Sequence, residues 1–194
     1  EVAEVASDVD RWRVGDRVMA LLGGGGYAQE VVVDAGSAMR VPDNLSLEQA
    51  AAIPEVFLTV FLYVFQLAGL RDGGSVLIHG GGSGIGTAAI QLARKMGCTV
   101  ITTVGSDDKI EKAKELGADH VINYRSDRFE GVTRKLTKKK GVDVVFEHVG
   151  KDTFAGSMLV LKRGGRLVTC GSTSGVSTDV NLMMLFQQQL KLFG

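Results

Sequence analysis

The sequence is poor in cysteine and in proline, with two of each among 194 residues. Cys98 and Cys170 are far apart and form no C-x-x-C pair. This argues against a disulfide framework and for a reducing compartment, with each cysteine acting as a small buried hydrophobic residue. Two prolines beside 26 glycines also argue against a disordered Gly/Pro linker.

An excess of charge of either sign is also absent, because Lys+Arg 22 and Asp+Glu 22 cancel. Bulk electrostatics therefore favours neither nucleic acid nor an anionic membrane. No run approaches the roughly 18 apolar residues of a membrane span, and the N-terminus lacks a signal-peptide pattern. The lysines at 135–140 have no interleaved aromatic residues for base stacking, and they are expected to complement the dipole at a helix end. The sequence predicts a cytoplasmic protein without membrane or nucleic-acid partners.

The N-terminal quarter is patterned like β-structure. Two strand-like runs, Arg17–Leu22 and Tyr27–Val33, flank a turn at Gly23–Gly26. Ser46 and Gln49 then form a capping-box pattern before an alanine-rich segment, which predicts a helix. A boundary is therefore expected near residues 42–46.

From residue 75 onward, short apolar runs alternate with amphipathic segments. The clearest helical pattern runs from Ile85 to Met96 with apolar residues on one face, and Gly97 and Gly117 are expected helix stops, with Ser106 as a helix cap. Repeated βαβ units predict a parallel sheet with helices on both faces. The predicted strands are Ser75–His79, Thr99–Val104, His120–Tyr124, Val142–His148 and Gly165–Cys170.

A glycine-rich turn, Gly80–Gly86, stands between the first of these strands and the first helix. Such a turn offers backbone N–H groups, no Cβ in the way and the positive end of a helix dipole, which together suit a diphosphate. Its departure from G-x-G-x-x-G is Ser83 at the middle position, so Gly82 and Gly84 are expected to allow the close approach.

The end of the second strand bears on which dinucleotide is favoured. NAD-binding folds place an acid there, and Thr103–Ser106 contains none. Lys109, Tyr124 and Arg125 could instead hold a 2′-phosphate, so NADP(H) is favoured over NAD(H). Asp107 and Asp108 weaken that argument, although anions at a helix N-terminus have a sufficient structural role.

At this point the sequence resembles a known family, the medium-chain dehydrogenase/reductase superfamily, and within it the zinc-free quinone oxidoreductases, most of all their p53-inducible group. The resemblance covers nearly the whole chain. The segments that support it are Val14–Met19, Gly24–Gln29, Ala50–Glu55, Leu58–Thr59, His79–Gly86, Ala88–Ala93, Leu116–Tyr124 and Gly164–Val168.

The resemblance implies a doubly wound parallel (Rossmann) sheet of the α/β class with part of an N-terminal GroES-like β-barrel domain. The implied domains are a partial barrel at 1–45, connecting helices at 46–72 and the dinucleotide-binding domain at 73–194. A complete family member extends beyond both ends, so the chain looks like a fragment that lacks much of the substrate pocket. The implied cofactor-binding residues are Thr59 near the nicotinamide, Gly82, Ser83, Gly84 and Ile85 at the diphosphate, Ser106, Lys109 and Tyr124 at the 2′-phosphate, and Val149, Gly150, Gly171 and Ser172 beside the nicotinamide ribose.

The resemblance also implies the activity, hydride transfer from NADPH to a small quinone or enone. No catalytic acid is identified, although Tyr27 and Tyr63 are possibilities. The alternatives are a zinc-dependent alcohol dehydrogenase and a dinucleotide-binding module without catalysis. Catalytic zinc is disfavoured, because the position of one family zinc ligand holds Glu55.

Two further features leave alternatives open. His79, His148 and Cys170 end neighbouring predicted strands, so they could form a metal site or supply a proton donor. The favoured interpretation is that they only line the cofactor crevice. The apolar segment Leu190–Phe193 is expected to be an exposed sixth strand, through which two copies could form a homodimer.

Overall fold

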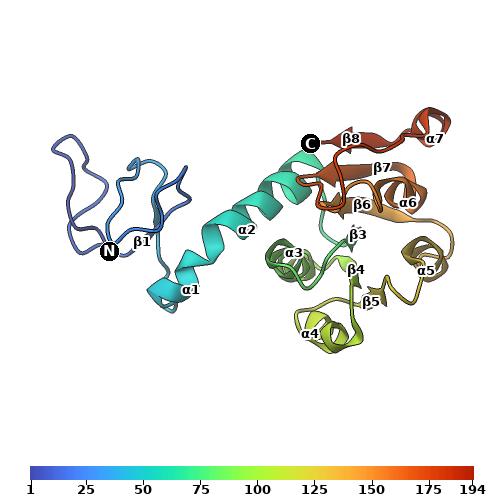
Figure 1. The fold of residues 1–194 in the computed structure, drawn as a ribbon, viewed down its shortest axis with the longest axis horizontal. Coiled ribbons are helices and arrows are strands. Elements are labelled where there is room, and N and C mark those ends of the chain that lie inside the picture. The colour runs from blue at the N-terminus through green and yellow to red at the C-terminus, as the bar shows by residue number, and fades with distance from the viewer. The chain divides into compact units, whose positions relative to one another are not determined.

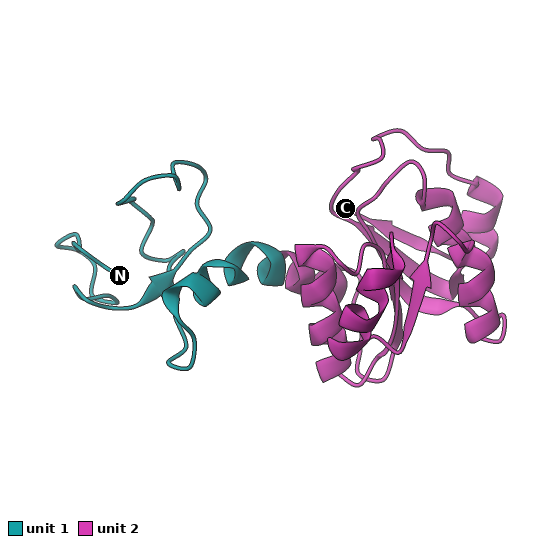
Figure 2. Cartoon of the chain, turned by 60° about the horizontal axis from the view of Figure 1, so that its bottom comes forward, with its two compact units in different colours: residues 1–58 teal, residues 59–194 magenta.

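The computed structural model describes residues 1–194. The chain forms two compact units, Glu1–Leu58 and Thr59–Gly194, shown in different colours in Figure 2. The domain ranges 1–45, 46–72 and 73–194 stay a prediction.

The N-terminal unit contains little regular structure. Two short strands, β1 (Val18–Met19) and β2 (Met39–Arg40), pair antiparallel. Helix α1 (Leu47–Ala51) begins with the predicted capping box, in which Ser46 Oγ accepts from the Gln49 N–H and Gln49 Oε1 accepts from the Ser46 N–H. This reciprocal bonding satisfies backbone donors that a helix start leaves free.

The two strands predicted in this unit are largely wrong. Only Val18–Met19 of the first run forms a strand, and Tyr27–Val33 forms none. A strand needs hydrogen bonds to a neighbouring strand, and no backbone hydrogen bond joins Tyr27–Val33 to any other segment. The side chains of Tyr27 and Val32 are fully exposed, so the β-branched pattern finds no surface to pack on.

The second unit is built on one parallel sheet of six strands in the order β5-β4-β3-β6-β7-β8 (Figure 1). The five predicted strands are all present, and the predicted sixth forms the edge. This confirms the doubly wound fold class. The strands are β3 (Ser75–Ile78), β4 (Thr99–Val104), β5 (His120–Asn123), β6 (Val142–Glu147), β7 (Leu161–Thr169) and β8 (Lys191–Phe193).

Helices cover both faces of this sheet. Figure 1 shows α3 and α4 on one face and α5 and α6 on the other. The predicted stops are confirmed, because Gly97 and Gly117 have φ of 65° and 114°. No helix is long and apolar enough to cross a membrane. The remaining bounds are α2 (Ile53–Val60), the π-helix η1 (Phe61–Leu67), α3 (Gly84–Lys95), the 3-10 turn η2 (Asp107–Lys109), α4 (Ile110–Glu115), α5 (Phe129–Leu136), α6 (Phe154–Leu159) and α7 (Leu182–Gln187).

The central strands supply the core. Leu77, Ile101, Val145 and Leu167, from β3, β4, β6 and β7, have no exposed surface. Burial of each such side chain contributes about 1.5–3 kcal/mol. Because the strands are parallel, their carboxyl ends lie at one edge of the sheet. Successive strands are added on one side of β3 and then, from β6 onward, on its other side, so the strand order reverses between the neighbours β3 and β6. Ligands of open α/β sheets bind at such a switch point.

Candidate functional site

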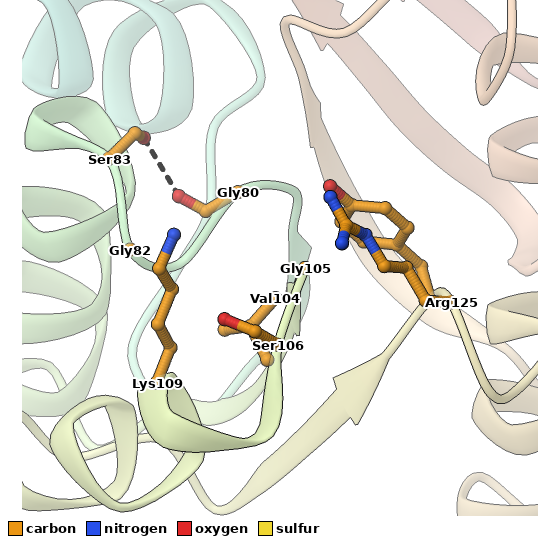
Figure 3. A pocket seen from close by; sticks show the side chains of 9 residues that line it. Gly80, Gly82, Ser83, Val104, Gly105, Ser106, Lys109 and Arg125 are labelled. Atoms are coloured by element: carbon orange, nitrogen blue, oxygen red, sulfur yellow. Dashed lines mark hydrogen bonds between the residues drawn. The ribbon is translucent and has the colours of Figure 1, made fainter.

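The turn after β3 is held by its own serine. Gly80 takes φ of +61°, which reverses the chain, and Ser83 is the N-cap of α3. Ser83 Oγ donates to the Gly80 carbonyl at 2.8 Å, drawn in Figure 3, and accepts from the Gly86 N–H at 3.0 Å. Serine at the middle position of the glycine motif is therefore the helix cap.

Two other glycines are required by packing. A Cβ on Gly81 would lie 2.4 Å from Thr102 Oγ1, and a Cβ on Gly86 would lie 2.1 Å from the Gly80 carbonyl oxygen. Both distances are far shorter than any real contact. The turn thus lies tightly against β4 on one side, and α3 lies tightly against the turn on the other.

The turn also leaves backbone donors free. The N–H groups of Gly82, Gly84 and Ile85 have no acceptor within the chain, whereas Gly81, Ser83 and Gly86 are all bonded. The free groups lie at the start of α3, a helix of 12 residues, where its dipole is positive. This arrangement suits an anion such as a diphosphate.

A pocket of about 330 Å³ opens beside the turn (Figure 3). It contains three groups that can bind a phosphate, from Lys109, Tyr124 and Arg125, and no carboxylate. The lysine stem lies across the turn, because a Cβ on Gly82 would be 3.1 Å from Lys109 Cδ. The lining residues are Gly80, Gly82, Ser83, Val104, Gly105, Ser106, Lys109, Tyr124 and Arg125.

The acidic residues near this pocket do not line it. Asp107 Oδ1 accepts from Asn123 Nδ2 at 2.7 Å. Ser106 occupies the predicted N-cap position, directly before the 3-10 turn η2, but its hydroxyl makes no capping hydrogen bond there. A hydrogen bond from the Ser106 side chain lowers the pKa of the Asp108 carboxyl, and Ser106 also lines the pocket.

A second pocket, of about 600 Å³, shares Gly80, Tyr124 and Arg125 with the first. Thr103 and Val149, at the carboxyl ends of β4 and β6, contribute to its lining. The two pockets thus follow one another along the ends of the strands.

The structure also brings the other predicted strand-end residues together. A Cβ on Gly150 would lie 3.0 Å from Ser172 Cα, and one on Gly171 would lie 3.1 Å from the His148 carbonyl oxygen. Val149, Gly150, Gly171 and Ser172 therefore form one cluster at the ends of β6 and β7. Thr59, in α2, is half-buried and lines neither pocket, so the structure does not join it to the others.

Below the second pocket lies a buried polar network that the sequence did not predict. His79 and Glu147, at the ends of β3 and β6, are 1% and 0% exposed. Ser157 lies between them, 2.9 Å from His79 Nε2 and 2.8 Å from Glu147 Oε2. Ser157 is 78 positions from His79 in the sequence, so no local sequence pattern predicts that these two residues are in contact.

Burial and hydrogen bonding give the two groups different charge states. Burial lowers the pKa of His79 to about 4, so its imidazole is neutral at neutral pH. Burial alone would raise the pKa of Glu147, but hydrogen bonds from Thr153, the Gly150 N–H and Ser157 outweigh it and lower that pKa. The network therefore contains a carboxylate and a neutral imidazole.

The other candidate side chains at these strand ends have structural partners. His148 Nε2 lies 2.7 Å from the His79 carbonyl oxygen. Burial, with the charge of Glu147, raises the pKa of Cys170 to about 11, so its thiol is protonated. No three His, Cys, Asp or Glu side chains are grouped in a way that could hold a metal ion. The absence of a catalytic metal in this protein stays a prediction.

Comparison with known proteins agrees with this geometry. Residues 84–194 match the family model described as zinc-binding dehydrogenase, which is more than half of the chain. The chain belongs to this family. The resemblance to medium-chain dehydrogenase/reductases of the quinone oxidoreductase type is thereby confirmed.

Several known proteins are similar to this chain. A quinone oxidoreductase of Salmonella typhimurium is 39% identical over 96% of the chain and 58% of its own length. A 2-haloacrylate reductase of a Burkholderia species is 36% identical over 94% of the chain and 56% of its own length. The crystal structure of Escherichia coli quinone oxidoreductase complexed with NADPH superposes with a TM-score of 0.86 at 35% identity, over 98% of this chain and 59% of that one. The chain thus spans less than three fifths of the length of these relatives.

Proposed function

We propose that the chain is the dinucleotide-binding part of an oxidoreductase that transfers hydride from NADPH to a small quinone or enone. One observation supports this above all. The free N–H groups of Gly82, Gly84 and Ile85 adjoin a pocket with Lys109 and no carboxylate. A dinucleotide with a 2′-phosphate needs both features.

The residues at the strand ends fit such a ligand in order. The three N–H groups would hold the diphosphate, and Ser106, Lys109 and Tyr124 would hold the 2′-phosphate. Ser83 would stabilise the conformation of the turn, because its hydroxyl donates one hydrogen bond and accepts another within the turn. The nicotinamide ribose would lie beside the cluster of Val149, Gly150, Gly171 and Ser172, with Thr59 near the nicotinamide as the family resemblance suggests.

When bound, NADPH supplies the hydride, and the protein supplies orientation and electrostatics. The names of the relatives favour an acceptor that is a quinone or an electron-poor alkene conjugated to a carbonyl group. His79 is not proposed as the proton donor, because both of its ring nitrogens already have partners within the chain. A cytoplasmic location stays part of the proposal.

The test is a calorimetric titration of three chains with NADPH and with NADH. We expect the wild-type chain to bind NADPH more tightly, since charged hydrogen bonds contribute about 1.5–3 kcal/mol. Lys109→Met should weaken NADPH binding about 10- to 100-fold and leave NADH binding unchanged.

Lys112→Met is the matched control, because Lys112 is exposed on α4 and lines neither pocket. It should bind both dinucleotides like the wild type. Equal binding of NADPH and NADH by the wild-type chain would contradict the assignment of the 2′-phosphate site.

We also propose that two copies associate through β8. This strand is the edge of the sheet, so one side of its backbone has no strand partner. Leu182, Met183 and Phe186 of α7, the helix that precedes β8, are more than half exposed. Light scattering at micromolar concentration should give the mass of a dimer, and a monomer would contradict the proposal.

A further inference from the structure

The buried network forms one continuous chain of hydrogen bonds from the turn after β3 to the turn after β6. The Gly80 N–H lies 3.2 Å from Thr103 Oγ1, which lies 3.2 Å from His79 Nδ1. His79 Nε2 meets Ser157, and Ser157 meets Glu147. The Glu147 carboxylate in turn accepts from the N–H groups of the turn after β6. The turn after β3 is thereby joined to the turn after β6 through side chains alone.

Chemistry assigns every proton along this chain. An ionised carboxylate only accepts, so Ser157 must donate its one proton to Glu147. Ser157 can then only accept from His79, which places the imidazole proton on Nε2. The bare Nδ1 must accept from the hydroxyl of Thr103, and Thr103 Oγ1 accepts from the Gly80 N–H. The carboxylate thus sets the direction of the whole chain.

The carboxylate is also tightly tied to the turn after β6. Glu147 Oε1 accepts from Val149 N–H at 2.7 Å and from Gly150 N–H at 3.1 Å. Thr153 Oγ1 lies 3.0 Å from Oε1 and 2.8 Å from Oε2. Gly150 has φ of 94°, in the left-handed region, so these bonds hold a backbone conformation that few residues adopt.

We propose that Glu147 is a positioning residue whose charge fixes the direction of this chain of hydrogen bonds, and that the chain holds the turns after β3 and β6 in the conformation that receives a dinucleotide. That the ligand is a dinucleotide rests on the proposed function. The direction of the hydrogen bonds does not depend on that function, and it can be measured without any ligand.

Glu147→Gln separates the charge of this residue from its shape. The two backbone N–H groups require the amide oxygen at the Oε1 position, so the amide NH₂ must face Ser157. Ser157 then accepts from that NH₂, and the only acceptor left in contact with its own proton is His79 Nε2. The imidazole must carry its proton on Nδ1 and donate to Thr103. The substitution should therefore reverse the tautomer of His79, which loss of packing alone would not do.

The experiment is long-range proton–nitrogen NMR of the full 194-residue chain with labelled histidine. The spectra of His120→Gln and His148→Gln identify the signals of those two histidines, and the remaining signal belongs to His79. We expect the Nε2–H tautomer in the wild type and the Nδ1–H tautomer in Glu147→Gln. Glu115→Gln, the same change on the exposed end of α4, should resemble the wild type. An Nδ1–H tautomer in the wild type, or an unchanged tautomer in Glu147→Gln, would overturn the proposal.

Ser157→Ala covers the case in which Glu147→Gln does not fold. It removes the Ser157 acceptor at 2.9 Å and leaves Glu147 Oε2, 3.7 Å from Nε2, as the nearest acceptor, so the preference for the Nε2–H tautomer should weaken. A fully retained Nε2–H tautomer in that variant would count against the chain of hydrogen bonds.

The affinity for NADPH provides a second measurement of the role of Glu147. Glu147→Gln should weaken NADPH binding about tenfold, since disturbed buried hydrogen bonds cost on the order of 1–3 kcal/mol. Adenosine 2′,5′-bisphosphate, which has only the adenosine half, should bind with less change. Equal weakening of both ligands would contradict a role at the turn after β6. If the wild-type chain binds no NADPH, the proposed function fails, while the tautomer still decides the positioning role of Glu147.

Discussion

The chain contains two glycine-rich runs, Gly23–Gly26 and Gly80–Gly86, and they have opposite structural roles. A Cβ added at Gly23, Gly24 or Gly25 would meet nothing within 4 Å. A Cβ added at Gly86 would lie within 2.1 Å of a backbone oxygen. Three of the four glycines of the first run have open space around them, whereas the second run is packed closely against β4 and against its own helix.

The flanking segments explain the difference. The second run joins β3, whose last three residues are buried, to an amphipathic helix, and Ser83 caps that helix. The first run leads into Tyr27–Val33, which forms no strand and makes no backbone hydrogen bond to another segment. Glycine content alone therefore does not make a binding turn. The strand before it and the helix after it determine what the backbone N–H groups can do.

The largest expected effect is that of Gly86→Ala. The added methyl group would overlap the Gly80 carbonyl oxygen, and the backbone of the turn would have to move. We expect the free energy of unfolding to fall by about 3 kcal/mol, at the upper end for overpacking. Urea unfolding measures this, and Gly24→Ala should change the same quantity by less than about 0.5 kcal/mol. Similar losses in the two variants would remove the contrast between the runs.

Acid should weaken the unit that contains the second run. The pKa of His79 is about 4 in the folded chain against 6.5 for an ordinary histidine, so the unfolded chain binds a proton first as pH falls. The contribution of this group to stability is full above pH 6.5 and is lost between 6.5 and about 4, by roughly 3 kcal/mol. The pKa of Glu147 is lowered as well, so its contribution is lost in the same direction as pH falls through the ordinary range of a glutamate.

Urea unfolding between pH 7 and pH 4 checks this, with the signal of residues 59–194 followed by amide hydrogen exchange. His79→Gln removes the titrating group and should flatten the pH dependence between 6.5 and 4. A flat profile in the wild type would mean that His79 takes up its proton at the same pH in the folded and the unfolded chain, which would contradict the lowered pKa.

The smallest effect on stability is expected for Gly82→Ala. Its added Cβ would lie 3.1 Å from Cδ of Lys109, the middle of a flexible side chain that can move aside. The free energy of unfolding should change by less than about 1 kcal/mol. NADPH affinity should fall all the same, because the methyl group occupies the approach to a free N–H group. Unchanged affinity in calorimetry would place the diphosphate elsewhere.

How much could be predicted from the sequence differs between these regions. Each strand of the parallel sheet is a short apolar run with its own boundaries, and Gly97 and Gly117 mark helix ends locally. The strands of residues 17–33 could not be predicted correctly, because a strand depends on a partner that the pattern does not reveal. Lys109, Tyr124 and Arg125 were predicted as phosphate ligands from the end of the second strand, which contains no acid, and the resemblance also implied Lys109 and Tyr124. The pocket brings these three side chains together.

The buried network could not be predicted, for a related reason. His79 is the last residue of one predicted strand, and Glu147 is the next to last residue of another. Their partner Ser157 belongs to α6, and nothing in its local sequence marks it as buried. Only the fold places these three side chains within hydrogen-bonding distance.

The most direct test of the account is amide NMR of the labelled chain during titration with NADPH. The account predicts that the largest shifts occur at Gly82, Gly84 and Ile85, whose N–H groups are free in the structure. Gly23, Gly24 and Gly25 should not shift. Saturable binding whose shifts lie outside Gly80–Gly86, or the absence of any shift there at saturating NADPH, would contradict the central claim that this turn receives the diphosphate.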